Sequence, residues 1–127
     1  MEFTFNNKSS RDFNIKIKKS NHLSIPRKKI EFVEVQGRTD NLIINEGSRE
    51  MLDIEIEAYI DCRDLDTYSY ALRLDEWLNS SNGYQDLIFD GGVELKAIFV
   101  GQIDFNSITK NFEEILLQFK AYREGDL

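Results

Sequence analysis

The sequence has 127 residues and a mass of 14.9 kDa, with 41% hydrophobic residues, 31% charged residues, a net charge of −7 and one cysteine. This length and composition are typical of one globular domain, so collagen-like and disordered proteins are excluded, and the single cysteine excludes a small secreted scaffold held by intrachain disulfides. The pI near 4.7 argues against non-specific binding of nucleic acid, and no run of ~18 apolar residues predicts a membrane span.

Charge is distributed unevenly along the chain. Residues 1–40 contain nine Lys or Arg and five Asp or Glu, a net charge of +4, whereas residues 41–127 have a net charge of −11. A basic and an acidic region on one small domain could meet head to tail between copies. The alternative is that they form two separate solvated faces.

Alternating apolar and polar residues predict strands in the first part of the chain. The pattern is present at residues 3–5 and again at residues 13–18, separated by the turn-forming residues 6–10. Pro26 favours a strand edge or entrance because it has no N–H to donate. Residues 30–35 are rich in β-branched and aromatic side chains and predict a third strand, with a bulge where Phe32 and Val33 interrupt the alternation.

The clearest strand pattern covers residues 51–60, where apolar and mainly acidic residues alternate strictly. Between Val35 and Met51 lies a polar stretch with two glycines, which is long enough for an extended hairpin arm. Three-and-four spacing then predicts one amphipathic helix over residues 65–79. Asp64 or Asp66 can cap its N-terminus, and Asn82-Gly83 can supply a left-handed stop after it.

The rest of the chain again has the period of strands. Residues 85–90 and 93–100 form two strands joined by the hairpin turn Gly91-Gly92, a short strand begins at Ile103 and Phe105, and the last strand covers residues 112–122. We therefore expect residues 1–127 to form a single domain that is mainly β. The predicted fold is an antiparallel β-sandwich or open barrel with one flanking helix and an extended hairpin arm.

No combination of residues predicts catalysis, so we expect a protein that is not an enzyme and needs no cofactor. His22 is the only histidine, and we expect it in a solvated loop; Cys62 follows a strand and is expected to be a small buried residue. Asp61, Asp64 and Asp66 offer oxygen ligands for a hard cation but lack the glycine turn and distal Glu of an EF-hand, so helix capping is favoured.

The aromatic residues near the predicted helix fit either a core or an interface between subunits. Trp77 is open to both interpretations. Tyr68 and Tyr70 are two residues apart and cannot share one helix face, so we expect one of them to be exposed.

The order of elements and several short stretches carry a resemblance to a known family. These stretches are Phe3-Thr4-Phe5-Asn6-Asn7-Lys8-Ser9-Ser10-Arg11-Asp12-Phe13, Ile25-Pro26-Arg27-Lys28-Lys29 and Val33-Glu34-Val35-Gln36-Gly37-Arg38-Thr39-Asp40, then a helix ending in Glu76-Trp77-Leu78, a Leu87-Ile88-Phe89 strand and an aromatic strand at Phe119. Together they resemble the N-terminal, ring-forming domain of the siphophage distal tail protein family. The second, carbohydrate-module-like domain of that family is not expected in this chain.

This resemblance implies a structural protein of a phage or prophage tail. It would form a homo-hexameric ring at the distal end of the tail tube, as a hub that links the tube to the baseplate or tail-tip adsorption apparatus. Its partners would be copies of itself, the tail tube protein and tail-tip or baseplate proteins. DNA would pass through the lumen without specific binding, no membrane insertion is implied, and the protein would be located in the virion tail after assembly in the cytoplasm of the host bacterium.

Contacts between copies are expected on the arm between Gly37 and Arg49 and on the exposed side of the helix. The arm contains an apolar triplet in a polar region, which needs either a partner or a core to cover it, so a core-capping loop is the alternative. The candidate interface residues are Lys28, Lys29, Arg38, Leu42, Ile43, Ile44, Tyr70 and Trp77.

Two other functions remain open from the sequence. A tail tube or tail-completion protein would use a similar fold in rings, and a tube protein would stack into long polymers. A β-sandwich binding module, for example one that binds carbohydrate, would be a monomer with an exposed aromatic platform around Tyr84, Trp77 or Tyr59.

Overall fold

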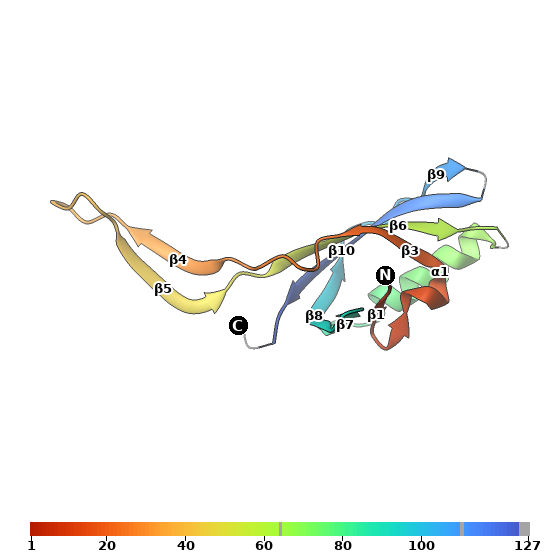
Figure 1. Ribbon diagram of the computed structural model, residues 1–127, viewed down its shortest axis with the longest axis horizontal. Helices are drawn as coiled ribbons and strands as arrows, with labels where there is room; N and C mark the ends of the chain where they lie inside the picture. Colours follow the sequence, from red (N-terminus) through yellow and green to blue (C-terminus); the bar gives the residue numbers. More distant parts are fainter. Residues whose placement is uncertain (64, 110, 125–127) are drawn as a thin grey trace.

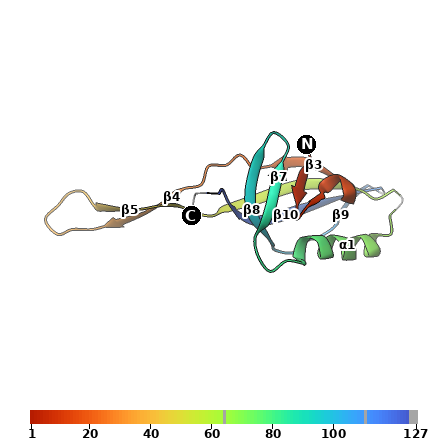
Figure 2. The same cartoon turned by 90° about the horizontal axis from the view of Figure 1, so that it is seen from below.

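A long hairpin that projects from a β-rich body defines the shape of the chain (Figure 1, Figure 2). The computed structural model describes residues 1–63, 65–109 and 111–124. These residues form mainly antiparallel strands and a single α-helix. The elements are β1 (Phe3–Phe5), β2 (Lys8–Ser9), the 3-10 helix η1 (Ser10–Phe13), β3 (Ile15–Ser20), β4 (Lys28–Val33), β5 (Leu42–Arg49), β6 (Leu52–Asp61), α1 (Thr67–Asn79), β7 (Gln85–Phe89), β8 (Val93–Val100), β9 (Asn106–Thr109) and β10 (Phe112–Tyr122).

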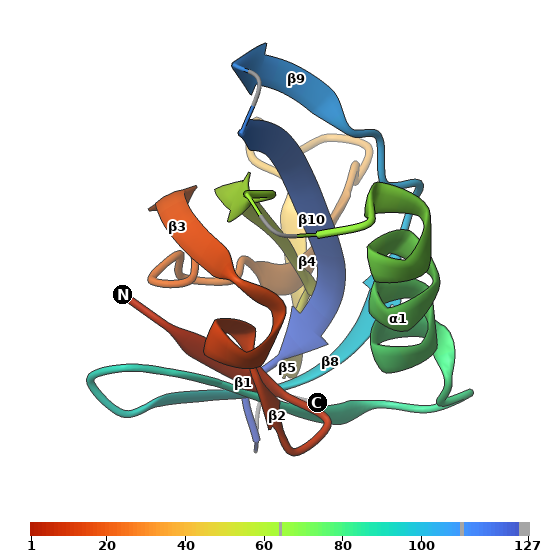
Figure 3. The ribbon, with the colours of Figure 1, turned by 90° about the vertical axis from the view of Figure 1, so that its right-hand side faces the viewer.

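One curled sheet forms the body, in the order β2-β1-β7-β8-β10-β6-β3, with β9 paired to β10. β1 is three places from β10 in this order, yet the ring of Phe5 in β1 lies 5.0 Å from the ring of Phe119 in β10. The two parts of the sheet therefore face each other across a shared core, with α1 along one side (Figure 3). The predicted mainly antiparallel, sandwich-like fold with a flanking helix and a hairpin arm is confirmed.

Strict alternation in β6 and β10 builds the centre of this core. The two strands pair over ten residues, with Phe119 opposite Ile54 and Leu117 opposite Ile56, and all four side chains are fully buried. Each such side chain contributes about 1.5–3 kcal/mol of hydrophobic stabilisation. The predicted strands at residues 51–60 and 112–122 are thus confirmed, the first with a shift of one residue.

Two predicted turns are confirmed by left-handed backbone conformations. Asn6 and Asn7 have φ of 51° and 66° between β1 and β2, a conformation that Asn tolerates better than most residues. The turn is shorter than the predicted residues 6–10, because β2 begins at Lys8 and η1 at Ser10. Gly91 and Gly92, both at φ 92°, join β7 to β8 in a tight hairpin.

Buried hydrogen bonds attach α1 to the N-terminal segment. The indole Nε1–H of Trp77 donates to the carbonyl of Phe5 at 2.7 Å, and the hydroxyl of Tyr70 donates to the carbonyl of Phe13 at 2.6 Å. The Trp77 ring also stacks on the Phe13 ring, with centroids 4.2 Å apart. Burial raises the pKa of the Tyr70 hydroxyl, so this group remains a protonated donor.

The ends of α1 differ from the sequence-based expectation. Asp66 occupies the N-cap position, but its carboxylate accepts a hydrogen bond from the Ser69 hydroxyl at 2.7 Å instead of from a backbone N–H. The other candidate cap, Asp64, lies outside the described residues. The predicted left-handed stop at Gly83 is wrong, because the C-cap residue Ser80 has a right-handed conformation and Gly83 does not have a positive φ.

His22 is buried, so the prediction of a solvated loop residue is wrong. Its ring stacks on the buried ring of Phe89 with centroids 4.2 Å apart, and its Nδ1 lies 3.0 Å from the hydroxyl of Ser20. The physical reason is that the turn after β3 brings the imidazole against the Phe89 ring, which offers an apolar surface to cover.

Two smaller expectations also change. Cys62 is half-buried and packs against the core as a small apolar residue. Ile103 and Phe105 are not in a strand; they lie in irregular backbone before β9, and their side chains are partly buried against the core.

Replacing Tyr70 with Phe should lower the free energy of unfolding by about 1–3 kcal/mol, because the carbonyl of Phe13 then loses a buried donor. The matched control is Tyr68→Phe on the exposed side of the same helix, where the change should stay within about 0.5 kcal/mol. Urea unfolding, followed through the fluorescence of the single tryptophan, measures both. Equal effects of the two substitutions would contradict the proposed anchoring of α1.

Candidate functional site

The hairpin arm, residues 28–49, is joined to the body at one end only. β4 and β5 form a two-stranded sheet of their own, and in the described part of the chain neither pairs with a strand of the body. At the base, the backbone N–H of Glu50 donates to the carbonyl of Arg27 at 2.7 Å, so both strands leave the body side by side. The arm then extends well beyond the rest of the molecule (Figure 1, Figure 2).

The pairing register sorts the side chains of the arm onto two faces, because opposed residues share a face and successive residues alternate. The predicted bulge at Phe32 and Val33 is wrong, since the register shift falls between Lys28 and Ile30. The aromatic face holds Lys28, Ile30, Phe32, Ile43 and Asn45; the aliphatic face holds Lys29, Glu31, Val33, Leu42 and Ile44.

Both faces of the arm expose apolar side chains to solvent. Phe32 and Ile43 are 64% and 61% exposed, and Leu42 and Ile44 on the other face are exposed as well. Among the described residues, the buried core contains none from the arm, so the alternative of a core-capping loop is wrong. A two-stranded ribbon is only marginally stable alone in water, and contiguous exposed apolar residues mark interaction sites. The arm therefore has the properties of an interaction surface.

The base of the arm is basic. Arg27, Lys28, Lys29 and Arg49 gather there, and none of the four makes an ion pair with another described residue. Arg49 instead donates from Nη1 to the carbonyl of Pro26 at 3.0 Å. These cations are free to meet carboxylates of a partner.

The tip of the arm contains an ion pair within its own turn. Arg38, a predicted interface residue, forms an ion pair with Asp40 at 2.9 Å. The turn is polar, and Gly37 adopts a φ of +84° that favours glycine. The apolar part of the arm therefore lies between a basic base and a polar tip.

Six of the eight predicted interface residues lie on the arm, but Tyr70 and Trp77 do not belong to a surface. Both are at most 3% exposed and are held in the core by the hydrogen bonds described above. The exposed aromatic and aliphatic residues of α1 are instead Tyr68 and Leu72. The prediction that one of Tyr68 and Tyr70 is exposed is confirmed, whereas the assignment of Tyr70 and Trp77 to an interface is wrong.

Two residues of the arm, Ile30 and Phe32, are not among the predicted interface residues. Their pattern predicts an ordinary strand of the sheet, yet they lie on the arm opposite Asn45 and Ile43. Apolar residues on both sides of the hairpin turn were the available signal. Their pattern is shared by buried strands, so the sequence alone could not separate the two cases.

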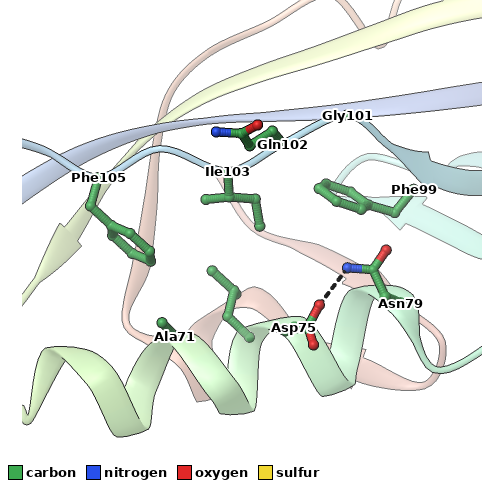
Figure 4. A pocket seen from close by; sticks show the side chains of 9 residues that line it. Ala71, Asp75, Asn79, Phe99, Gly101, Gln102, Ile103 and Phe105 are labelled. Atoms are coloured by element: carbon green, nitrogen blue, oxygen red, sulfur yellow. Dashed lines mark hydrogen bonds between the residues drawn. The ribbon is translucent and has the colours of Figure 1, made fainter.

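A groove lies along α1 on the body. It is bounded by α1 and by the segment from Phe99 to Phe105, and its volume is about 330 Å³. Figure 4 shows Ile103 and Phe105 pointing toward the helix, with Ala71 and Asp75 on the opposite wall. The groove is mainly apolar and carries an acidic group on its helical wall.

We also compared the structure with what a sugar-binding module, a metal-binding protein and a membrane protein would require. Of the residues expected around a sugar-binding platform, Trp77 is buried, while Tyr84 is exposed and packs edge-on against Tyr122 with ring centroids 5.1 Å apart. Among the described residues, no group of three or more His, Cys, Asp and Glu is placed to hold a metal ion. The helices in this part of the chain are too short or too polar to cross a bilayer.

The fold has a counterpart among solved structures. It matches the SPP1 Dit protein, which is described as a paradigm of the hub adsorption apparatus in phages that infect Gram-positive bacteria, with a TM-score of 0.76 and 12% sequence identity. The match covers 98% of this chain and 50% of that chain, so this chain spans about half the length of SPP1 Dit. No protein-family model matches the sequence, and no curated protein matches it significantly. The fold thus resembles that of a phage hub adsorption protein.

Replacing residues 28–49 with Gly-Gly should leave the body folded, because Arg27 and Glu50 already lie within hydrogen-bond distance. The free energy of unfolding of the single copy should change by no more than about 1 kcal/mol, since the arm adds nothing to the buried core. Urea unfolding of dilute protein measures this. The core substitution Ile54→Ala serves as a control and should cost about 2–5 kcal/mol. An armless chain that fails to fold would show that the arm is part of the body.

Proposed function

We propose that this chain is a structural protein of a phage or prophage tail that forms a homo-hexameric ring at the distal end of the tail tube. The ring would act as a hub between the tube and the baseplate or tail-tip adsorption apparatus. The likeness to SPP1 Dit over 98% of the chain is the observation that carries this proposal. The resemblance of the sequence to the ring-forming domain of distal tail proteins supports it independently.

The arm supplies a physical reason for assembly. A ring of identical copies needs two different complementary surfaces on each copy, and it closes only if the rotation between copies returns to the start. The arm offers one such surface on one side of the molecule, and the body offers others on the far side (Figure 1). Covering the exposed apolar residues of the arm would stabilise the assembly by about 25 cal/mol per Å² of apolar surface removed from water, before the cost of association.

The charge of the chain fits a passage for DNA. A net charge of −7 gives little affinity for phosphates, so a lumen lined by this protein would not retain the genome. The proposed role is mechanical, with no reaction, cofactor or specific nucleic-acid binding. The protein would be found in the virion tail after assembly in the host cytoplasm.

Purified protein at high concentration should form rings with six-fold symmetry in one or two layers. Light scattering after size exclusion gives the mass, and negative-stain images of the same sample give the symmetry. The armless variant should remain monomeric under the same conditions, because it lacks the main uncovered apolar surface.

Two outcomes would contradict the proposal. Long tubes would favour a tail tube protein, because a tube protein stacks without limit. A strict monomer at every concentration, with an intact arm, would favour the monomeric binding module.

A further inference from the structure

The groove along α1 has the chemistry to receive an apolar segment with a positive charge. Leu74 and Phe99 are buried side chains on its lining, and Ile103 and Phe105 are partly buried there. Asp75 is exposed on the helical wall and hydrogen-bonds only to Asn79 among the described residues, at 2.8 Å. Its carboxylate makes no ion pair with any described residue.

Exposed apolar side chains continue along α1 beside the groove. Tyr68 and Leu72 are 73% and 54% exposed, and they lie one turn apart on the same side of the helix as Asp75. A partner that lies along α1 would therefore contact two exposed apolar side chains and then a carboxylate.

The aromatic face of the arm has the complementary order of groups. Phe32 and Ile43 form the most exposed apolar pair of this face. Toward the base of the arm, Ile30 comes next, and Lys28 is the last residue of the face. Among the described side chains that the register places on this face, none is acidic. The aliphatic face carries Glu31 between its apolar residues, and that carboxylate would be repelled by Asp75.

We propose that the aromatic face of the arm of one copy docks along the α1 groove of a second copy, with Phe32 in the groove and Lys28 beside Asp75. This inference rests on the proposed function, because it identifies the surface that receives the arm in the ring. The arm points away from the α1 side of its own body, so a chain cannot fill its own groove (Figure 1, Figure 2).

The dimensions of the two surfaces agree. Lys28 lies about 13 Å from Phe32 along β4, at ~3.3 Å per residue. The helical wall of the groove from Ala71 to Asn79 is about 12 Å long, at ~1.5 Å per residue. With Phe32 at the Ala71 end, the backbone of Lys28 lies near Asn79. Its long side chain then extends back by one helical turn, about 6 Å at ~1.5 Å per residue, which brings its ammonium group beside Asp75.

Four other hollows on the body are lined mainly by polar or charged residues, so they fit the arm less well. The one between β3 and β6 is lined by Lys19, Asn21, Glu55 and Glu57, all of which are polar. An apolar face buried there would strip water from these groups without giving them partners. The α1 groove pairs apolar surface with apolar surface and a cation with a carboxylate.

Photocrosslinking from the arm tests the docking directly. Phe32 replaced by p-benzoylphenylalanine keeps an aromatic ring at this position. Light should join two copies, and peptide mapping should place the crosslink in α1 or residues 99–105. The same replacement at Leu42, on the aliphatic face, is the matched control and should crosslink outside the groove.

A charge swap tests the polar contact independently. Lys28→Glu and Asp75→Lys should each weaken association between copies about tenfold, and the double variant should recover most of the loss, because the swapped pair is again opposite in sign. Lys29→Glu on the other face is the control and should not be rescued by Asp75→Lys.

The results separate this inference from the proposed function. Rings in which Phe32 crosslinks elsewhere, or in which the charge swap gives no recovery, would overturn the docking and leave the ring standing. A wild-type chain that never associates would overturn both.

Discussion

The buried Trp77 is the constraint on which the body depends. Its ring stacks on Phe13 and packs against Phe3, while its Nε1–H satisfies the carbonyl of Phe5. One side chain of α1 therefore holds η1 and β1 in place, and β1 is the part of the sheet that faces β10 across the core. Tyr70 of the same helix packs edge-on against Phe105, with ring centroids 6.4 Å apart, so α1 is held next to residues 99–105, where the groove lies.

The arm differs from the body because its apolar side chains are exposed to solvent. Stability of the body comes from side chains that the arm does not supply, and the arm exposes on two faces the residue types that the body buries. Such a ribbon gains little stability from contacts within its own chain and much from contacts with a partner, because only a partner removes Phe32 and Ile43 from water. The molecule thus separates folding from assembly: the core stabilises one copy, and the arm remains available for the next.

Sequence periodicity predicted the elements that have one buried face and one solvated face. Apolar and polar residues alternate in β6 and β10 because one face of each strand is buried. The spacing of apolar residues changes from two to three and four where α1 begins. These elements, the turns at Asn6-Asn7 and Gly91-Gly92 and the hairpin are therefore all predicted from the sequence. What periodicity could not supply was long-range contact. The His22 ring stacks on Phe89, which is far away in the sequence. Tyr70 and Trp77 likewise pack in the core and donate hydrogen bonds to carbonyls of distant residues. The groove joins residues about 30 positions apart, which no local pattern encodes.

The central claim is that the arm is covered by another copy when the protein assembles. Hydrogen–deuterium exchange of residues 28–49, compared between dilute single copies and concentrated assemblies, tests it most directly. A lone two-stranded ribbon opens easily and should exchange quickly, whereas a docked arm should be protected by at least tenfold. The amides of β6 and β10 should exchange slowly in both states. Assemblies in which the arm exchanges as fast as in the single copy would contradict the account.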